Sequence, residues 1–240
     1  MTGIASGAVL SPEIDLASAA KVVKEENARV AHLIGVNPAA RTTTVKPAGT
    51  TSLVLGTSSG IHAYHHDNYI RRIRVGKNEA IYSYLAINHP ELIEDEFFRP
   101  HDTAVISIPQ KAPEEAIYRT ESPFQILERV KKVAGEWVRP GHRSGSNTHN
   151  VSATISVREN EWDSVGNWMW NNREHYNGLS VLPYDGGTYQ QAPFETCEEA
   201  TYEKMMESLT AVDLTKVIEL DDNTDLSGEA ACAGGACEIT

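Results

Sequence analysis

The chain has 240 residues, of which 40% are hydrophobic and 22% charged, and its formal net charge is −12. This composition is typical of globular domains, and the negative charge argues against duplex nucleic acid, whose phosphates bind clustered Lys and Arg. The sequence has no apolar run of about 18 residues and no basic segment before an apolar one at its start. We therefore expect no transmembrane helix, no signal peptide and no membrane partner. Three cysteines in a chain of this length fit the cytoplasm.

Hydrophobic periodicity and helix-start signals predict alternating helices and strands. The Ser-Pro pairs at 11–12 and 122–123 are typical of helix starts, and apolar residues that alternate with Ser and Thr predict a strand with one buried face. Helices that alternate with short strands indicate an α/β fold with parallel strands. In chain order, the predicted elements are a helix over 11–35, a strand over 41–45, a helix over 122–137, a strand over 151–157, a helix over about 160–173 and a strand over 179–182.

A Gly- and Thr-rich segment, Lys-Pro-Ala-Gly-Thr-Thr-Ser at 46–52, follows the first predicted strand and precedes an apolar helical turn. Gly49 allows close approach of the backbone to a ligand, and the amides after it would be the unpaired donors of a helix start. Such amides beside hydroxyl side chains suit a phosphate group. The spacing of a Walker A loop is absent. An ordinary capped strand-to-helix turn fits the residue types equally well.

Two other polar clusters give weaker signals. His62, His65 and His66 do not have the spacing of a known metal-binding pair, so we expect hydrogen-bonded or surface histidines and no metal site. The basic run at 71–74 could help to hold a phosphate or could be a solvated face.

The last residues contain two of the three cysteines, Cys232 and Cys237, on either side of Ala-Gly-Gly-Ala. From Glu195 onward the sequence has twelve acidic residues and two lysines, which predicts a solvated, flexible arm. A mobile dithiol suggests a redox shuttle, and the pairing lacks the second ligand pair of a zinc site. Cys197 stands apart and is interpreted as an inert thiol.

Four segments carry a resemblance to a known family: NPAARTTTVKPAGTTSLVLGTSSGIH at 37–62, YIRRIRVG at 69–76, LPYDGGTYQQAP at 182–193 and the tail CAGGAC. In this order they resemble the C-terminal part of the monomeric, adenosylcobalamin-dependent (class II) ribonucleoside-triphosphate reductases. The similarity covers essentially the whole chain.

The resemblance implies a fold and a division of the chain. Residues 1–195 would be the C-terminal half of a ten-stranded α/β barrel with its phosphate-binding loop, 196–220 a helix and extension after the barrel, and 221–240 a flexible tail with a redox dithiol.

The resemblance also implies a function: conversion of ribonucleoside triphosphates to 2′-deoxyribonucleotides by a cobalamin-initiated thiyl-radical mechanism. Cys232 and Cys237 would form the shuttle dithiol that thioredoxin or a similar dithiol reduces. The residues that would bind the substrate phosphates are Ala48, Gly49, Thr50, Thr51 and Ser52.

The family's radical cysteine and its substrate-reducing cysteine pair have no counterpart in this sequence, because Cys197 matches neither. We therefore expect the chain to be inactive alone and to need an N-terminal reductase half on another polypeptide, with which it would share adenosylcobalamin. A gene fragment would explain the same departures. A non-catalytic nucleotide-binding or assembly module of a reductase is the alternative function, and a thioredoxin-like carrier is disfavoured because the pair is not Cys-x-x-Cys.

Overall fold

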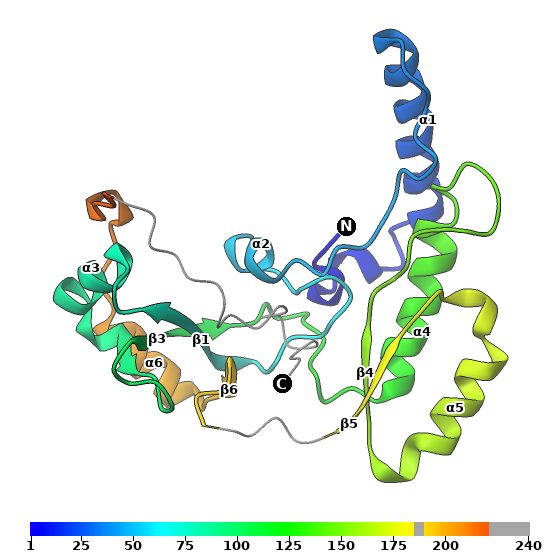
Figure 1. Ribbon diagram of the computed structural model, residues 1–240. Coiled ribbons are helices and arrows are strands. Elements are labelled where there is room, and N and C mark those ends of the chain that lie inside the picture. The colour runs from blue at the N-terminus through cyan, green and yellow to red at the C-terminus, as the bar shows by residue number, and fades with distance from the viewer. Residues whose placement is uncertain (185–189, 221–240) are drawn as a thin grey trace. The chain divides into compact units, whose positions relative to one another are not determined.

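The computed structural model describes residues 1–184 and 190–220, apart from the side chains of Thr50 and Leu53 (Figure 1). The chain divides into two compact units, and each is discontinuous in sequence. The first unit consists of Met1–Tyr64 and Pro113–Asp185, and the second of His65–Ala112 and Gly186–Thr240. The predicted tail dithiol lies outside the described residues.

The first unit is mainly helical and contains one parallel strand pair. Strands β4 (Thr154–Val157) and β5 (Ser180–Pro183) pair in parallel from Thr154 opposite Ser180 to Val157 opposite Pro183. Helix α5 (Trp162–Asn171) connects them, so the predicted strand–helix–strand unit is confirmed. The other elements of this unit are η1 (Ile4–Ser6), η2 (Ala8–Leu10), α1 (Leu16–Ile34), α2 (Gly49–Val54), α4 (Pro123–Val133), the π-helical turn η4 (Ala134–Val138), η5 (Glu159–Glu161) and η6 (Arg173–His175).

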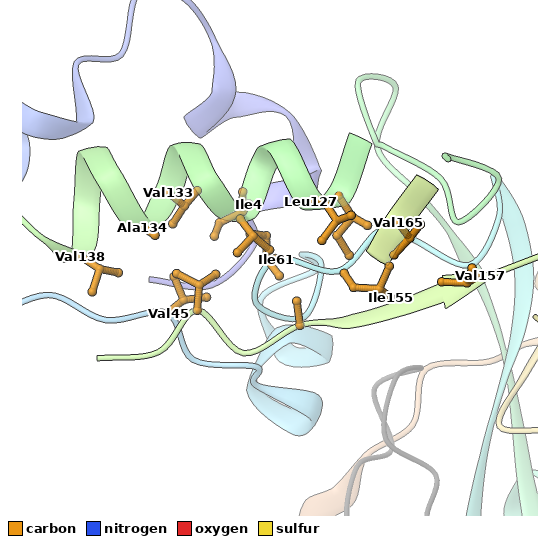
Figure 2. Close-up of a cluster of buried hydrophobic side chains, with 14 residues drawn as sticks. Ile4, Val45, Ile61, Leu127, Val133, Ala134, Val138, Ile155, Val157 and Val165 are labelled. Carbon is orange, nitrogen blue, oxygen red and sulfur yellow. The ribbon is translucent and has the colours of Figure 1, made fainter. Parts of the chain in front are cut away.

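The core of the first unit lies between α4 and β4 (Figure 2). Leu127 on α4 and Ile155 on β4 are fully buried there. Ile4, Val45 and Ile61 join the same cluster from three separate segments. Val45 and Ile61 fix the segments on either side of residues 46–52, so the core sets the position of the candidate site.

The helix starts follow their capping residues. Helix α4 begins at Pro123 as predicted, and the Ser122 amide donates to Gln125 Oε1 at 2.8 Å in a capping box. Helix α1 begins later than predicted, at Leu16, because the Asp15 carboxylate accepts the Ser18 amide at 3.0 Å and caps the helix there. The Ser11-Pro12 pair instead follows the short turn η2.

The strand predicted over 41–45 is wrong, since only a single bridge forms there, between Arg41 and His142. The hydrogen bonds of this segment go to the end of η4 and the residues after it. Thr43 Oγ1 donates to Trp137 O at 2.6 Å, and Trp137 Nε1 donates to Thr44 O at 3.0 Å. The β-branched residues are extended as expected, but their partners are a helix end rather than another strand.

The second unit contains a four-stranded sheet in the order β2-β3-β1-β6, with antiparallel pairing throughout. The expectation that the strands are parallel is therefore wrong for this unit. The two long strands pair from Asn68 opposite Lys111 to Gly76 opposite Thr103. The elements are β1 (Asn68–Gly76), α3 (Ala80–Asn88), η3 (Pro90–Leu92), β2 (Ile93–Asp95), β3 (Thr103–Lys111), β6 (Phe194–Thr196), α6 (Glu199–Ser208) and η7 (Leu214–Lys216).

The chain is thus a mixed α/β protein. The strands of the described residues form two separate sheets and no closed barrel. The division of the chain at 195 and 220 stays a prediction. No helix among the described elements is long and apolar enough to cross a membrane.

Candidate functional site

The segment 46–52 borders a pocket of about 490 Å³ in the first unit. Helix α2 begins at Gly49, and its first intrahelical bond runs from the Ser52 amide to Ala48 O at 3.2 Å. The amides just before Ser52 therefore belong to the first turn of the helix, where donors lack an intrahelical acceptor. The pocket is lined by Met1, Thr2, Lys46, Pro47, Ala48, Gly49 and Thr51.

The N-terminal segment holds one side of this pocket in place. The Lys46 amide donates to Met1 O at 2.8 Å, and the Ile4 amide donates to Gly60 O at 3.0 Å. Thr2 Oγ1 accepts the Gly60 amide at 2.8 Å. The N-terminal residues thereby link the segment before α2 to the loop after it.

The loop that follows α2 touches the pocket wall directly. Gly60 has a φ of +59°, and a Cβ on it would lie 2.9 Å from Pro47 Cα. The Thr57 amide donates to Ser52 O at 2.9 Å. Only glycine combines this left-handed backbone with so close an approach at low cost.

A buried ion pair anchors the far end of this loop to α4. Arg129 forms two hydrogen bonds with the Glu121 carboxylate, at 2.6 and 2.8 Å, and both side chains are nearly fully buried. Arg129 Nε also donates to Ile61 O at 3.2 Å. The paired guanidinium therefore fixes the backbone one residue beyond Gly60.

His62 ties the same loop to β4. Its Nε2 accepts the Thr154 amide at 3.1 Å, which leaves the ring proton on Nδ1, where it donates to Ser59 O at 3.2 Å. Burial lowers the pKa of His62, and the positive charge of Arg129 lowers it further. His62 is thus held neutral by its surroundings.

The charged side chains around the pocket favour an anion. Lys46 is the one charged side chain among its lining residues, and none of them is a carboxylate. Lys46 forms no ion pair with a carboxylate of the described residues. In a chain of net charge −12, a cation beside helix-start amides favours a bound anion such as phosphate.

The five residues of the predicted phosphate site do not all face this pocket. Ala48, Gly49 and Thr51 line it. Ser52 is buried, and its hydroxyl donates to Gly49 O at 3.1 Å, so it shapes the helix turn instead. The structure adds Thr2 and Lys46, which sequence reasoning did not assign. Lys46 begins the quoted motif, so a search for a cation next to the glycine would have found it. The phosphate role of the segment stays a prediction.

The basic run at 71–74 belongs to the second unit and has internal partners. Arg71 is buried with its guanidinium 4.4 Å from the centre of the Phe194 ring. Arg72 pairs with Glu94 and Glu195, and Arg74 with Glu96. These charges hold the sheet together, so neither a phosphate site nor a solvated face describes them.

Thiol and metal chemistry find little support in the described residues. Burial raises the pKa of the Cys197 thiol, and the charge of Glu195 raises it further. A thiol with a raised pKa is a weak nucleophile at neutral pH, which agrees with its interpretation as inert. Over residues 1–184 and 190–220, no group of three or more His, Cys, Asp or Glu side chains is placed to hold a metal ion.

No protein-family model matches the chain, but similar proteins are known. The structure is similar to a crystal structure of a B12-dependent (class II) ribonucleotide reductase, with a TM-score of 0.69 and 25% identity over 84% of this chain and 27% of that one. Fold and sequence thus define the class of protein that this chain resembles, the ribonucleotide reductases.

Curated relatives narrow the class. The chain is 28% identical over 229 residues to the adenosylcobalamin-dependent ribonucleoside-triphosphate reductase of Lactobacillus delbrueckii subsp. bulgaricus, which covers 91% of this chain. The enzyme of the same description from Lactobacillus acidophilus is 29% identical over 86% of the chain, and that of Levilactobacillus brevis 26% over 86%. The resemblance inferred from the sequence is therefore confirmed. The chain spans only 29%, 27% and 27% of these relatives, respectively, so it corresponds to a part of such a protein.

Proposed function

We propose that this chain is the C-terminal, substrate-phosphate-binding part of an adenosylcobalamin-dependent ribonucleoside-triphosphate reductase. The observation that carries the proposal is the pocket beside α2, whose lining residues include Lys46 and the start of the helix and no Asp or Glu. The relatives that match over nine-tenths of the chain are named ribonucleoside-triphosphate reductases, which supports the reaction that we propose, the reduction of ribonucleoside triphosphates to 2′-deoxyribonucleotides.

The pocket would bind and orient the substrate through its phosphates. Backbone amides from Gly49 to Thr51 would donate to phosphate oxygens, with hydroxyls of the same segment and the Lys46 ammonium beside them. A triphosphate held at one end positions its ribose with respect to the reacting groups, which lowers the entropic cost of reaching the transition state. The contacts of Gly60, His62 and Arg129 would hold the pocket wall in place before the substrate binds.

Adenosylcobalamin, on which the relatives depend, would supply the radical that starts the reaction when it is bound to the complete enzyme. The pocket of about 490 Å³ lies in the size range of sites for drug-sized ligands, and a cobalamin is considerably larger than such a ligand. The residues that line this pocket therefore do not fit the cofactor on their own, and we assign none of them to it.

The tail cysteines would supply electrons between turnovers. A Cys232 or Cys237 thiolate would attack an oxidised cysteine pair in the active site and form a mixed disulfide. The second tail thiol would then attack the tail sulfur of this mixed disulfide and release the active-site thiolate. The active-site pair is then reduced, and the two tail cysteines form a disulfide. A thioredoxin-like dithiol would reduce the tail in the same way. The three cysteines of the sequence do not include a separate active-site pair and a radical cysteine, so those groups would come from the N-terminal reductase half.

A reconstitution assay tests this proposal. The chain would be mixed with the polypeptide that carries the remaining reductase sequence, together with adenosylcobalamin, a ribonucleoside triphosphate and thioredoxin with its reducing system. We expect deoxyribonucleotide to form only when both polypeptides are present. Replacement of both tail cysteines by serine should abolish thioredoxin-supported turnover and leave a single turnover of the pre-reduced enzyme. Unchanged multiple turnover of that variant would favour the non-catalytic module, and a folded mixture without product would overturn the proposal.

A further inference from the structure

Helix α2 has little apolar packing to hold it in place. Among its described side chains only that of Ser52 is buried. Val54 is 82% exposed, and Leu55, the residue after the helix, is 63% exposed. The hydrophobic effect is proportional to the apolar area removed from water, so it contributes little to the position of these two residues. Among the described contacts, hydrogen bonds at the two ends of the helix remain to set its direction.

The C-terminal end of α2 is fixed by a left-handed glycine and a buried tyrosine. Gly56 has a φ of +60°, and the Thr57 amide donates to Ser52 O at 2.9 Å. This bond is that of a Schellman motif, which satisfies the last carbonyl groups of a helix. Tyr64 Oη donates to Gly56 O at 3.3 Å, and the tyrosine side chain is buried. Tyr64 thus holds the backbone at the point where α2 ends.

Three hydroxyl groups form a chain of hydrogen bonds that ends at Gly56 O. Ser6 Oγ lies 3.1 Å from Tyr64 Oη and 2.7 Å from Thr57 Oγ1. A hydroxyl group has one proton to donate and two lone pairs with which to accept. Because Gly56 O can only accept, the Tyr64 proton points to it. The Ser6 hydroxyl then donates to Tyr64, and the Thr57 hydroxyl donates to Ser6.

The Ser6 hydroxyl has no spare donor or acceptor capacity in this chain. Its oxygen accepts the Ser58 amide at 3.2 Å as well as the Thr57 hydroxyl, and its proton goes to Tyr64. A Cβ on Gly3 would overlap Thr57 Oγ1, so the N-terminal segment confines the first donor of the chain. Hydrogen bonds in such a chain polarise one another. Loss of the Tyr64 proton therefore removes the direction of the whole chain and not only one contact.

We propose that Tyr64 is a positioning residue for the phosphate pocket beside α2. The inference rests on the proposed function. Tyr64 does not line the pocket, whose lining residues at the helix start are Ala48, Gly49 and Thr51. It acts through the helix, which has only six residues and is about 9 Å long at 1.5 Å per residue. A shift of its C-terminal end therefore moves the first-turn amides, and the hydroxyl chain keeps these amides directed at the substrate phosphates.

Calorimetric titration with ATP tests this role in Tyr64→Phe, which removes only the hydroxyl group. Tyr176→Phe is the matched control, because Tyr176 Oη donates to Met169 O in α5 at 3.0 Å. Each variant loses one hydrogen bond from a phenol to a backbone carbonyl group, and α5 contributes no residue to the pocket. We expect Tyr64→Phe to weaken ATP binding by about threefold to tenfold, as the loss of one uncharged hydrogen bond would. Tyr176→Phe should bind ATP like the unmodified chain.

The urea midpoint separates positioning from stability. A residue that only stabilises the first unit would lower the midpoint and leave the ATP affinity in the absence of urea unchanged, which is the result that we expect for Tyr176→Phe. Ser6→Ala should weaken ATP binding as Tyr64→Phe does. The double variant should bind ATP as weakly as the weaker single variant, because both changes interrupt the same chain.

Two results would overturn the inference: equal ATP affinity of Tyr64→Phe and Tyr176→Phe, or affinity losses of Tyr64→Phe and Ser6→Ala that add in the double variant. Absence of ATP binding by the unmodified chain would count against the proposed function instead.

Discussion

Gly60→Ala tests whether the loop after α2 sets the position of the candidate phosphate pocket. Gly60 lies in the left-handed region at φ +59°, and its missing Cβ would be 2.9 Å from Pro47 Cα and 3.2 Å from Pro47 N. The methyl group of alanine must therefore push the pocket wall or move the loop. We expect lower stability and weaker phosphate binding together, because the displaced backbone carries Lys46.

The magnitude follows from two separate costs. A left-handed alanine costs about 1–2 kcal/mol, and overpacking against backbone atoms adds about 1–3 kcal/mol. Gly56 provides the matched control, because it has the same left-handed backbone, at φ +60°, and no atom lies within 4 Å of the position that an alanine methyl group would occupy. Gly56→Ala should therefore lose only the first amount, about 1–2 kcal/mol.

Urea unfolding followed by tryptophan fluorescence measures this difference. The four tryptophans are Trp137, Trp162, Trp168 and Trp170, and all lie in the first unit, so their emission reports that unit alone. Gly60→Ala should shift the midpoint further than Gly56→Ala, by about 1 M if the slope is about 1–3 kcal/mol per M. Equal midpoints and equal phosphate affinities for the two variants would refute a role of the Gly60–Pro47 contact.

Three further outcomes follow from the contacts around this loop. Glu121→Gln should destabilise the first unit by about 3–5 kcal/mol, because it leaves the Arg129 guanidinium buried without its charge partner. As the control, Glu26→Gln removes the exposed pair between Glu26 and Arg29 on α1 and should not shift the urea midpoint. Stability should fall as the pH drops below about 6.5, because His62 becomes protonated in the unfolded chain at a higher pH than in the folded chain, where its pKa is lowered. His62→Gln, whose amide oxygen can accept the Thr154 amide, should flatten this part of the pH profile. An unchanged profile would contradict the assignment. Gly141→Ala should lower the free energy of unfolding by about 2 kcal/mol or more in the same assay, because its Cβ would overlap the buried Thr43 hydroxyl. The control, Gly166→Ala in α5, has open space around it and should be neutral or stabilising by up to about 1 kcal/mol. The opposite order would show that the 41–45 segment is free to move.

Local signals in the sequence predicted the elements whose partners are close in sequence. The strand–helix–strand unit over 151–183 was found because β4 alternates clearly and α5 bridges it to β5. Helix α4 was found because Ser122 and Pro123 mark its start and its apolar face is regular. In each case the residues that determine the element lie within it or beside it.

Long-range pairing accounts for what the sequence did not predict. The segment 41–45 is extended, yet its hydrogen-bond partners come from residues near 140. The arginines of β1 look like an anion site in isolation, but the carboxylate partners of Arg72 and Arg74 lie on β2, on the residue after it and on β6, more than 20 residues away. Within the pocket, Gly49 was recognisable from its own segment, whereas Thr2 reaches the pocket, and Gly60 its Pro47 wall, only through the fold.

Calorimetric titration with a ribonucleoside triphosphate tests the central claim most directly. Lys46→Met removes the ammonium group and keeps most of the side-chain length, and Lys204→Met in α6 makes the same change in the second unit. A charge-assisted contact contributes about 1.5–3 kcal/mol, so Lys46→Met should weaken binding by roughly 10- to 150-fold, while Lys204→Met should bind like the unmodified chain. Equal affinity of the two variants, or no binding of the triphosphate by the unmodified chain, would contradict a substrate-phosphate site beside α2.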